Sequence, residues 1–301
     1  MDVHSHNSDD PPTVDCDECS TRSETAAQFE DETLMVAAFT GWNDAASAAT
    51  TALAHISEAL EGRLLDELDM DPYVDYQVNR PTTILTGHGR KLLWPTTRIE
   101  LVSSSAARRN LILVHGVEPS MRWRSYYQEI LGLARTFKCQ GIVLLGSLLA
   151  DVSHNAAPNV EVHTDNIELQ KNFSIGASSY EGPTGIVGVL AQAAEQDGLP
   201  TVSLWAPVPH YAPSAVAHSA ALGIVSALED VLGIAIPHRD LTELAQDWKQ
   251  TIQNQVDSDQ DLTQYVRALE KAISQSPLPQ ATGDSIAREF ERYLRRGDPL
   301  E

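Results

Sequence analysis

Residues 180–211 read YEGPTGIVGVLAQAAEQDGLPTVSLWAPVPHY, and this stretch decides the fold. A Gly-rich turn precedes an Ala-, Leu- and Val-rich segment with helical spacing. A second turn at Asp197-Gly198 then leads into a short apolar run and a loop rich in Pro, His and Tyr. The pattern predicts a helix followed by a buried strand, which is half of a parallel α/β unit.

The turn that opens this stretch has two possible uses. Gly182-Pro183 suits a helix start, because the N–H that Pro lacks would be unpaired there. Free N–H groups beside Thr184 and Gly185 could hold an anion. However, the spacing is not G-x-G-x-x-G and no P-loop Lys follows. We therefore expect Gly185 and Gly188, which share a helix face, to serve close packing.

The order of strand, polar loop and helix recurs on both sides of this stretch. Ala45 to Leu60 is predicted to be a helix with Asn43 or Asp44 as its N-cap. Further helices are expected at about 120–137 and 214–232. Buried strands are predicted at Thr33–Phe39, Leu111–Val114, Ile142–Leu145, Phe173–Ser178 and Thr201–Trp205. These elements predict an α/β fold, a three-layer sandwich around a mostly parallel mixed sheet.

Between the helix predicted at Ala45 to Leu60 and the strand predicted at Leu111–Val114, the sequence is rich in β-branched residues and is interrupted by prolines. Extended segments are predicted at Val74–Val78, Thr82–Gly87 and Leu92–Ser103. The run Gly87-His88-Gly89-Arg90 is typical of a hairpin turn. Because Pro cannot donate to a central ladder, we expect edge or antiparallel strands here.

Three regions are expected. Residues 1–32 hold ten carboxylates against the single Arg22 and are predicted to be a flexible acidic tail. Residues 33–236 form the α/β domain. Residues 237–301 form a helical C-terminal appendage with amphipathic helices at about 241–255, 262–273 and 285–295.

The net charge of −21 argues against nucleic acid and anionic membrane surfaces as partners, since there is no basic stripe to neutralise phosphates. No apolar run reaches the roughly 18 residues of a membrane span, and the start is acidic rather than a signal peptide. A cytoplasmic protein is expected. Cys16 and Cys19 with His4 and His6 have zinc-ligand chemistry, but the His-x-His half fits no standard spacing. We expect no metal and no cofactor.

Polar residues follow the predicted strands repeatedly. Because ligands bind at the carboxyl ends of parallel strands, we expect these side chains to meet on one rim as a ligand or partner site. If four of them share a site, crowded carboxylates should raise at least one pKa there (Asp44, Glu118, His154 and Glu181). The candidates are Trp42, Asn43, Asp44, His115, Glu118, Ser147, Asp151, His154, Glu181, Thr184, His210 and Tyr211.

These residue types would suit a hydrolase, but the motifs are missing. Ser147 with His154 or His210, and one of Asp44, Glu118 or Asp151, has the residue types of nucleophile, base and orienting acid. Yet Ser147 lies in Leu-Gly-Ser-Leu rather than in G-x-S-x-G. No H-E-x-x-H spacing is present either. No catalytic residue is therefore assigned.

The loop motifs together resemble a known family. In order, the chain carries Gly41-Trp-Asn-Asp-Ala45, His115-Gly-Val-Glu-Pro119, Gly146-Ser147 through His154, Tyr180-Glu-Gly-Pro-Thr-Gly185 and Trp205-Ala-Pro-Val-Pro-His-Tyr211. Over about residues 33–235 this resembles the PAC2 family, named after proteasome assembly chaperone 2, in an actinobacterial-type form. The resemblance implies a phosphorylase/hydrolase-like sandwich.

The resemblance also implies a role. Eukaryotic relatives are non-catalytic chaperones of proteasome α-ring assembly, and prokaryotic relatives form homo-oligomers. This implies an assembly or interaction protein that pairs with itself, with a trimer expected, and has proteasome subunits as possible partners. The ending Asp298-Pro-Leu-Glu301 does not match the hydrophobic-Tyr-X tail of such chaperones. The alternative is a small-ligand binder or hydrolase that uses the strand-end loops, which a pocket with three or more converging polar groups would favour.

Overall fold

The computed structural model describes residues 32–275 except residues 88, 105–108, 174 and 214. The expected acidic tail, the zinc donors Cys16 and Cys19, the helix near 285–295 and the C-terminal end lie outside the described residues. The main sheet contains β1 (Glu32–Thr40), β2 (Arg63–Leu68), β5 (Thr97–Ser104), β6 (Arg109–Val117), β7 (Ile142–Ala150), β8 (Glu161–His163) and β9 (Thr201–Pro209).

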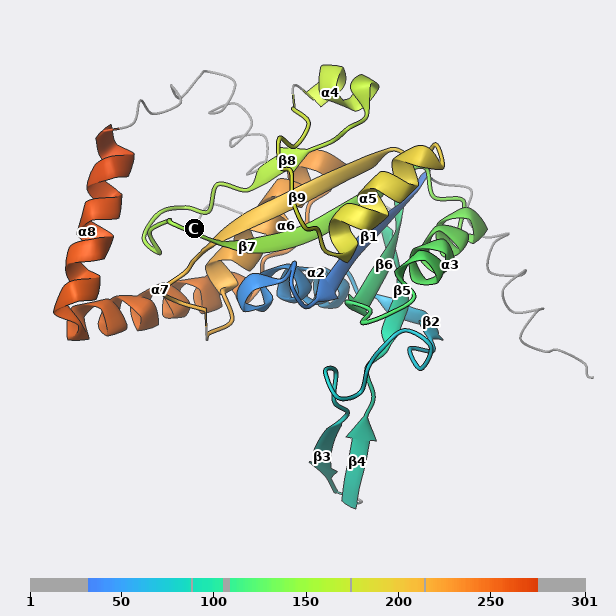
Figure 1. Ribbon diagram of the computed structural model, residues 1–301, viewed down its shortest axis with the longest axis horizontal. Coiled ribbons are helices and arrows are strands. Elements are labelled where there is room, and N and C mark those ends of the chain that lie inside the picture. The colour runs from blue at the N-terminus through green and yellow to red at the C-terminus, as the bar shows by residue number, and fades with distance from the viewer. Residues whose placement is uncertain (1–31, 88, 105–108, 174, 214, 276–301) are drawn as a thin grey trace, which may run out of the picture.

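The sheet is mixed and mostly parallel, as predicted. Its seven strands run in the order β2-β5-β6-β1-β7-β9-β8 (Figure 1). The four central strands β6, β1, β7 and β9 are parallel to one another. The pairs β2–β5, β5–β6 and β9–β8 are antiparallel. The central strands are apolar on both faces because both faces are covered.

Helices cover both faces, which confirms the three-layer α/β sandwich (Figure 1). On one face Leu111 and Leu113 pack with α2 (Ala48–Ala59), α6 (His218–Leu232) and α7 (Leu241–Ser258). On the other face Ile112 and Val114 pack with α3 (Trp123–Thr136) and α5 (Ile186–Gln196). The alternation along β6 follows from the two-residue period of a strand.

The C-terminal helices join this core. Trp248, Ile252 and Val256 lie on one face of α7 and are buried in the core cluster, in which α7 packs on α6. After α7 the chain turns into α8 (Gln260–Gln275), whose Val266 is buried. None of the helices in the described part of the chain combines the length and the apolar character needed to cross a bilayer.

Two predicted strands are wrong. Residues 74–78 form no strand, since turns occupy 71–73 and 76–78, and the N–H of Val74 donates to the carbonyl of Met70. The strand predicted at Phe173–Ser178 is also wrong, because α4 (Ile167–Phe173) ends on its first residue and the described residues after it form a single bridge, from Gly176 to His163. The helix that leads into this stretch starts at Asn166, whose Oδ1 accepts from the N–H of Glu168 and Leu169 at 3.1 Å.

The extended stretch Leu92–Ser103 is also divided. Pro95 separates β4 (Gly89–Leu93) from β5, and β4 pairs with β3 (Thr82–Thr86) in the predicted hairpin. This hairpin is a separate two-stranded sheet that projects from the body (Figure 1). The short strands β2 and β8 were not predicted.

Two aromatic rings pack so closely on Gly116 that no larger residue fits at this position. A Cβ on Gly116 would lie 2.5 Å from Cδ1 of Phe39 and 2.8 Å from the hydroxyl of Tyr126. Both rings are buried, and the hydroxyl of Tyr126 is hydrogen-bonded to Thr97 Oγ1 at 2.8 Å. Neither ring is therefore free to move aside.

We expect Gly116→Ala to lower the free energy of unfolding by about 1–3 kcal/mol, because an added methyl group overpacks the space between the two rings. Gly132→Ala in α3 is the matched control, since a Cβ there meets no atom within 4 Å. That change should stabilise the helix by about 0.5–1 kcal/mol. Urea denaturation measures both, and equal stability of the two variants would contradict this packing.

Candidate functional site

The structure divides most of the predicted rim residues between two groups. The helix-cap group surrounds the N-termini of α2 and α5 and contains Trp42, Asn43, Asp44, Glu118, Ser147 and Thr184. The docking group lies where α7 and α8 meet the loops after β7 and β9, and contains Asp151, His154, His210 and Tyr211. His115 and Glu181 belong to neither.

Two rim side chains cap α5. Glu118 and Asn43 come together because they follow the parallel neighbours β6 and β1, which end at the pair Thr40 and Val117. Glu118 Oε1 accepts from the N–H of Ile186 at 2.8 Å, and Asn43 Oδ1 accepts from the next N–H, that of Val187, at 3.4 Å. The helix N-terminus thus faces a carboxylate of the chain itself, which its dipole favours.

The cap requires a glycine. A Cβ on Gly185 would lie 1.9 Å from Asn43 Oδ1 and 2.7 Å from Glu118 Oε1. Gly188 leaves space for the side chain of Thr184 one turn earlier, because a Cβ on Gly188 would lie 2.1 Å from Thr184 Oγ1. Glu118 also ties in the first loop, since its Oε2 accepts from the N–H of Trp42 at 3.3 Å.

Asp44 and Ser147 hold the start of α2. Asp44 Oδ1 accepts from the N–H of Ala49 at 2.8 Å, and its Oδ2 accepts from Thr50 Oγ1 at 2.5 Å. Burial raises the pKa of Asp44, although the hydrogen bonds from Thr50 and Ala49 act in the opposite direction. Ser147 is fully buried and its Oγ donates to the carbonyl of Ala45 at 3.0 Å. Its hydroxyl therefore supports the loop and does not face a substrate.

In the docking group His154 joins the sheet to α7. The hydroxyl of Tyr211 lies 2.9 Å from both the N–H and Nδ1 of His154, and Nε2 lies 3.0 Å from Gln253 Oε1. These partners suit a neutral ring that accepts at Nδ1 and donates from Nε2. Burial lowers the pKa of His154, which agrees with the neutral form.

A second set of contacts joins the same loops to α8. Asp151 Oδ1 accepts from the hydroxyl of Tyr265 at 3.0 Å and lies 3.1 Å from Nδ1 of His210. The rings of His210 and Tyr265 meet edge to face at 5.2 Å. Hydrogen bonds from Asn155 and Ser153 lower the pKa of Glu270 on α8. The polar residues after β7 and β9 therefore anchor the C-terminal helices.

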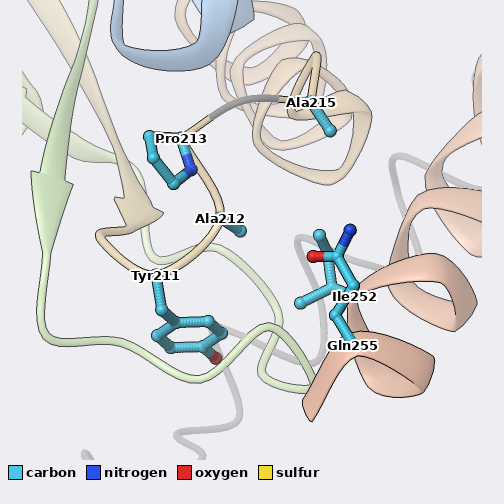
Figure 2. Close-up of a pocket in the computed structure, with 6 residues that line it drawn as sticks. All are labelled: Tyr211, Ala212, Pro213, Ala215, Ile252 and Gln255. Atoms are coloured by element: carbon cyan, nitrogen blue, oxygen red, sulfur yellow. The ribbon is translucent and has the colours of Figure 1, made fainter. Parts of the chain in front are cut away.

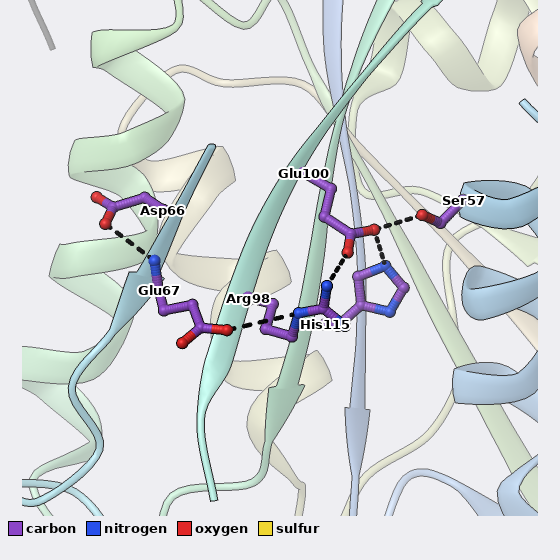
Figure 3. A network of polar contacts seen from close by, with 6 residues as sticks. All are labelled: Ser57, Asp66, Glu67, Arg98, Glu100 and His115. Atoms are coloured by element: carbon purple, nitrogen blue, oxygen red, sulfur yellow. Dashed lines mark hydrogen bonds and ion pairs between the residues drawn. The ribbon is translucent and has the colours of Figure 1, made fainter. Parts of the chain in front are cut away.

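His115 lies further along the sheet, in a buried network that was not predicted (Figure 3). Glu100 accepts from Ser57 Oγ and pairs with Arg98 Nη2 at 2.7 Å. Nε2 of His115 lies 3.2 Å from Glu100 Oε2. Burial lowers the pKa of His115, and the Glu100 carboxylate partly opposes this.

The network is not arranged as a Ser-His-acid triad, because Ser57 donates to the carboxylate rather than to the imidazole. A lone Glu in the apolar strand segment Arg98-Ile-Glu-Leu-Val102 was the sequence signal for it. The docking partners Gln253, Tyr265 and Glu270 were also missed, since nothing local connects them with the rim.

The remaining candidate is Glu181, which is exposed and makes no hydrogen bond or ion pair with the described residues. Of the four residues expected to share a site, Asp44 and Glu118 lie in the helix-cap group and His154 in the docking group. Over the described residues, no group of three or more His, Cys, Asp or Glu side chains is placed to hold a metal ion.

We expect Glu118→Gln to lower the free energy of unfolding by about 0.3–1 kcal/mol, because it keeps an acceptor oxygen but removes the charge at the helix terminus. Glu118→Ala leaves the N–H of Ile186 without this partner and should cost about 1–3 kcal/mol. The control Glu181→Gln should change stability by less than about 0.5 kcal/mol. Urea denaturation distinguishes them, and a gain of stability in Glu118→Gln would contradict the cap.

The docking group should respond to pH. The pKa of His154 lies below the 6.5 of an exposed His, so below that pH the unfolded chain binds a proton that the folded chain excludes. Stability from neutral His154 is present in full above pH 6.5 and is lost as the pH falls toward the lowered pKa.

We therefore expect the stability advantage of the wild type over His154→Gln to be constant near neutrality and to shrink on acidification. Denaturation curves between about pH 8 and pH 5.5 test this. Both proteins contain His115 and His218, whose pKa values burial also lowers, so the contributions of these residues to the pH dependence cancel in the difference between wild type and variant. A difference that stays constant over the whole range would show that His154 is not held neutral.

Proteins of known structure resemble this chain in sequence and in fold. The PAC2 family model matches residues 38–256. A PAC2 family protein from Streptomyces avermitilis is 42% identical with a TM-score of 0.73, over 78% of this chain and 100% of that chain. A proteasome-assembly chaperone homologue from Mycobacterium tuberculosis is 36% identical with a TM-score of 0.70, over 77% of this chain and 99% of that chain.

A more distant structure shares the fold. The archaeal proteasome activator PbaB from Pyrococcus furiosus is 16% identical with a TM-score of 0.60, over 75% of this chain and 94% of that chain. A search of the curated proteins finds no match. Because the family model spans well over half of the sequence and two solved relatives exceed 30% identity, this chain belongs to the PAC2 family.

Proposed function

We propose that this protein is a non-catalytic assembly factor that binds proteasome subunits at the strand-end rim of its sheet and works as a cytoplasmic homo-oligomer, with a trimer expected. The relative from Mycobacterium tuberculosis, a proteasome-assembly chaperone homologue, supports the proposal because it aligns along most of this chain. The family of the chain supports it as well.

The observation that carries the proposal is the chemistry of the rim. Three of its polar side chains are occupied by internal contacts, since Glu118 and Asn43 cap α5 and Ser147 holds the start of α2. In contrast, Trp42 and Tyr180 are exposed by 61% and 65% in the loops beside the cap. An edge with occupied polar groups and exposed aromatic rings suits a protein partner better than a small polar substrate.

Leu148 extends this apolar surface. It is 43% exposed and follows Ser147, whose N–H donates to the carbonyl of Asn43. The period of a strand places Leu148 on the same face as Leu144, the face that α5 covers. We define Trp42, Leu148 and Tyr180 as the rim patch.

The alternative of a small-ligand site has weaker support. A pocket of about 210 Å³ lies between the loop after β9 and α7 (Figure 2), lined by Tyr211, Ala212, Pro213, Ala215, Ile252 and Gln255. It is smaller than the roughly 300–1,000 Å³ of typical ligand pockets. Only Tyr211 and Gln255 offer polar side chains, and the hydroxyl of Tyr211 is already bonded to His154.

The proposal is tested by co-expression with the proteasome α-subunits encoded in the same genome. We expect the wild-type chain to co-purify with them, and Trp42→Ser combined with Leu148→Ser to reduce the recovered α-subunit at least about tenfold, because apolar anchors dominate such interfaces. Ile167→Ser is the control, since Ile167 is more exposed than either of these residues but lies on α4.

Unchanged recovery with the double variant would exclude the rim patch as the binding surface. No recovery with the wild-type chain would reject the proteasome as the partner. Denaturation curves of the variants show whether a loss of binding reflects unfolding.

A further inference from the structure

The hairpin β3–β4 is an unsupported element of the fold. Its two strands form a sheet of their own, without a hydrogen-bonded neighbour in the main sheet. Both outer edges therefore present unpaired backbone groups. An isolated two-stranded hairpin is marginally stable in water, so this one needs a covering surface. We call residues 80–94 the arm.

The arm exposes apolar side chains on both faces. Leu85 is 81% exposed, and Leu92, Leu93 and Trp94 are each exposed by 44–55%. Neighbours along β4 point to opposite faces, so Leu92 and Leu93 cannot both be covered by one side of the body. At the root, the ring of Trp94 meets that of Tyr76 edge to face at 5.1 Å.

The charge of the arm is opposite to that of the molecule. Residues 76–97 contain no Asp or Glu, whereas the whole chain carries a net charge of −21. Arg80, Arg90 and Lys91 are exposed, and none of them forms an ion pair with the described residues. The arm is therefore a basic and apolar projection from an acidic protein.

The segment before the arm has the complementary charge. Residues 66–75 contain no Lys or Arg, and they carry five carboxylates: Asp66, Glu67, Asp69, Asp71 and Asp75. We call this segment the acidic base. The arm leaves the body beside it, and the hydroxyl of Tyr76 donates to Asp71. One chain thus carries a basic apolar surface and an acidic surface next to each other.

We propose that the arm docks on the acidic base of a second copy of this chain. The tip cannot reach its own base, because strands of five residues place it about 16 Å from the root. A second copy offers its acidic base to the basic arm of the first. The arm of each copy can make the same contact with the base of another copy. This inference rests on the homo-oligomer proposed above and identifies its interface.

Two closed arrangements satisfy this contact. In a dimer, each arm lies on the base of the other copy, so the interface is self-complementary. In a ring, each arm lies on the base of the next copy, and three copies give the expected trimer. The two arrangements differ in mass and not in the residues that meet.

Charge reversal tests the contact in the purified full chain. The first variant changes the arm, Arg90→Glu with Lys91→Glu, and the second changes the base, Glu67→Lys with Asp69→Lys. We expect the wild type to be oligomeric at micromolar concentration by light scattering. Each variant should raise the dissociation midpoint at least about tenfold, because like charges then face each other.

The decisive sample is one chain that carries all four changes, because every arm then meets a base of opposite charge in the dimer and in the ring, and assembly should return. A mixture of the two variants should also assemble as a dimer, whereas in a ring of three one contact between like charges remains and recovery should be partial. Neither rescue can be explained by misfolded variants. The control Glu243→Lys with Asp247→Lys makes the same change of net charge as the base variant, on exposed residues of α7, and should assemble as the wild type does.

A monomeric wild type would overturn the inference, and so would arm and base variants that keep the wild-type mass. Arm and base variants that dissociate, together with a chain carrying all four changes that stays dissociated, would overturn the pairing of arm with base. The purified chain contains no proteasome subunit, so these results are independent of the rim patch. An oligomer that assembles through the arm but does not bind α-subunits would reject only the proposed function.

Discussion

The burial of β1 on both faces is the constraint from which the rest of the structure follows. Met35 to Phe39 are at most 1% exposed, and their side chains alternate between the two apolar cores. A strand buried on both sides needs helices above and below it, and parallel neighbours joined by crossovers provide them. The order of β6, β1, β7 and β9 and the placement of α2, α3, α5 and α6 satisfy this need.

The same arrangement determines the chemistry of the rim. Parallel strands bring their carboxyl ends to one edge, where enzymes of this architecture place ligands. Here the polar groups at that edge are used to satisfy free N–H groups of helices and to hold loops. Glu118 does this for α5 and Asp44 for α2, and His154 joins the rim to α7. The exposed side chains beside them include the large apolar ones of Trp42, Leu148 and Tyr180.

Two surfaces thus stand out, each with its own chemistry. The rim patch is apolar and lies beside two helix caps, while the arm is basic and apolar on an acidic body. The first suits a partner of another kind, and the second suits the acidic base of another copy. An assembly factor that works as an oligomer needs both kinds of contact, and the arm projects away from the main sheet (Figure 1).

Periodicity and turn chemistry in the sequence by themselves determined the alternation of strands and helices, the mixed parallel sheet, the hairpin near Gly87 and the capping role open to Asp44. These depend on local spacing, which the chain displays directly. Tertiary structure alone decided what the rim residues do, because Glu118 meets Ile186 and His154 meets Gln253 only after distant segments pack. It also left the stretch Phe173–Ser178 with a single bridge, from Gly176 to His163, in place of the expected strand. The burial of Glu100 with His115 likewise required the pairing of β5 with β6, a contact that no local pattern encodes.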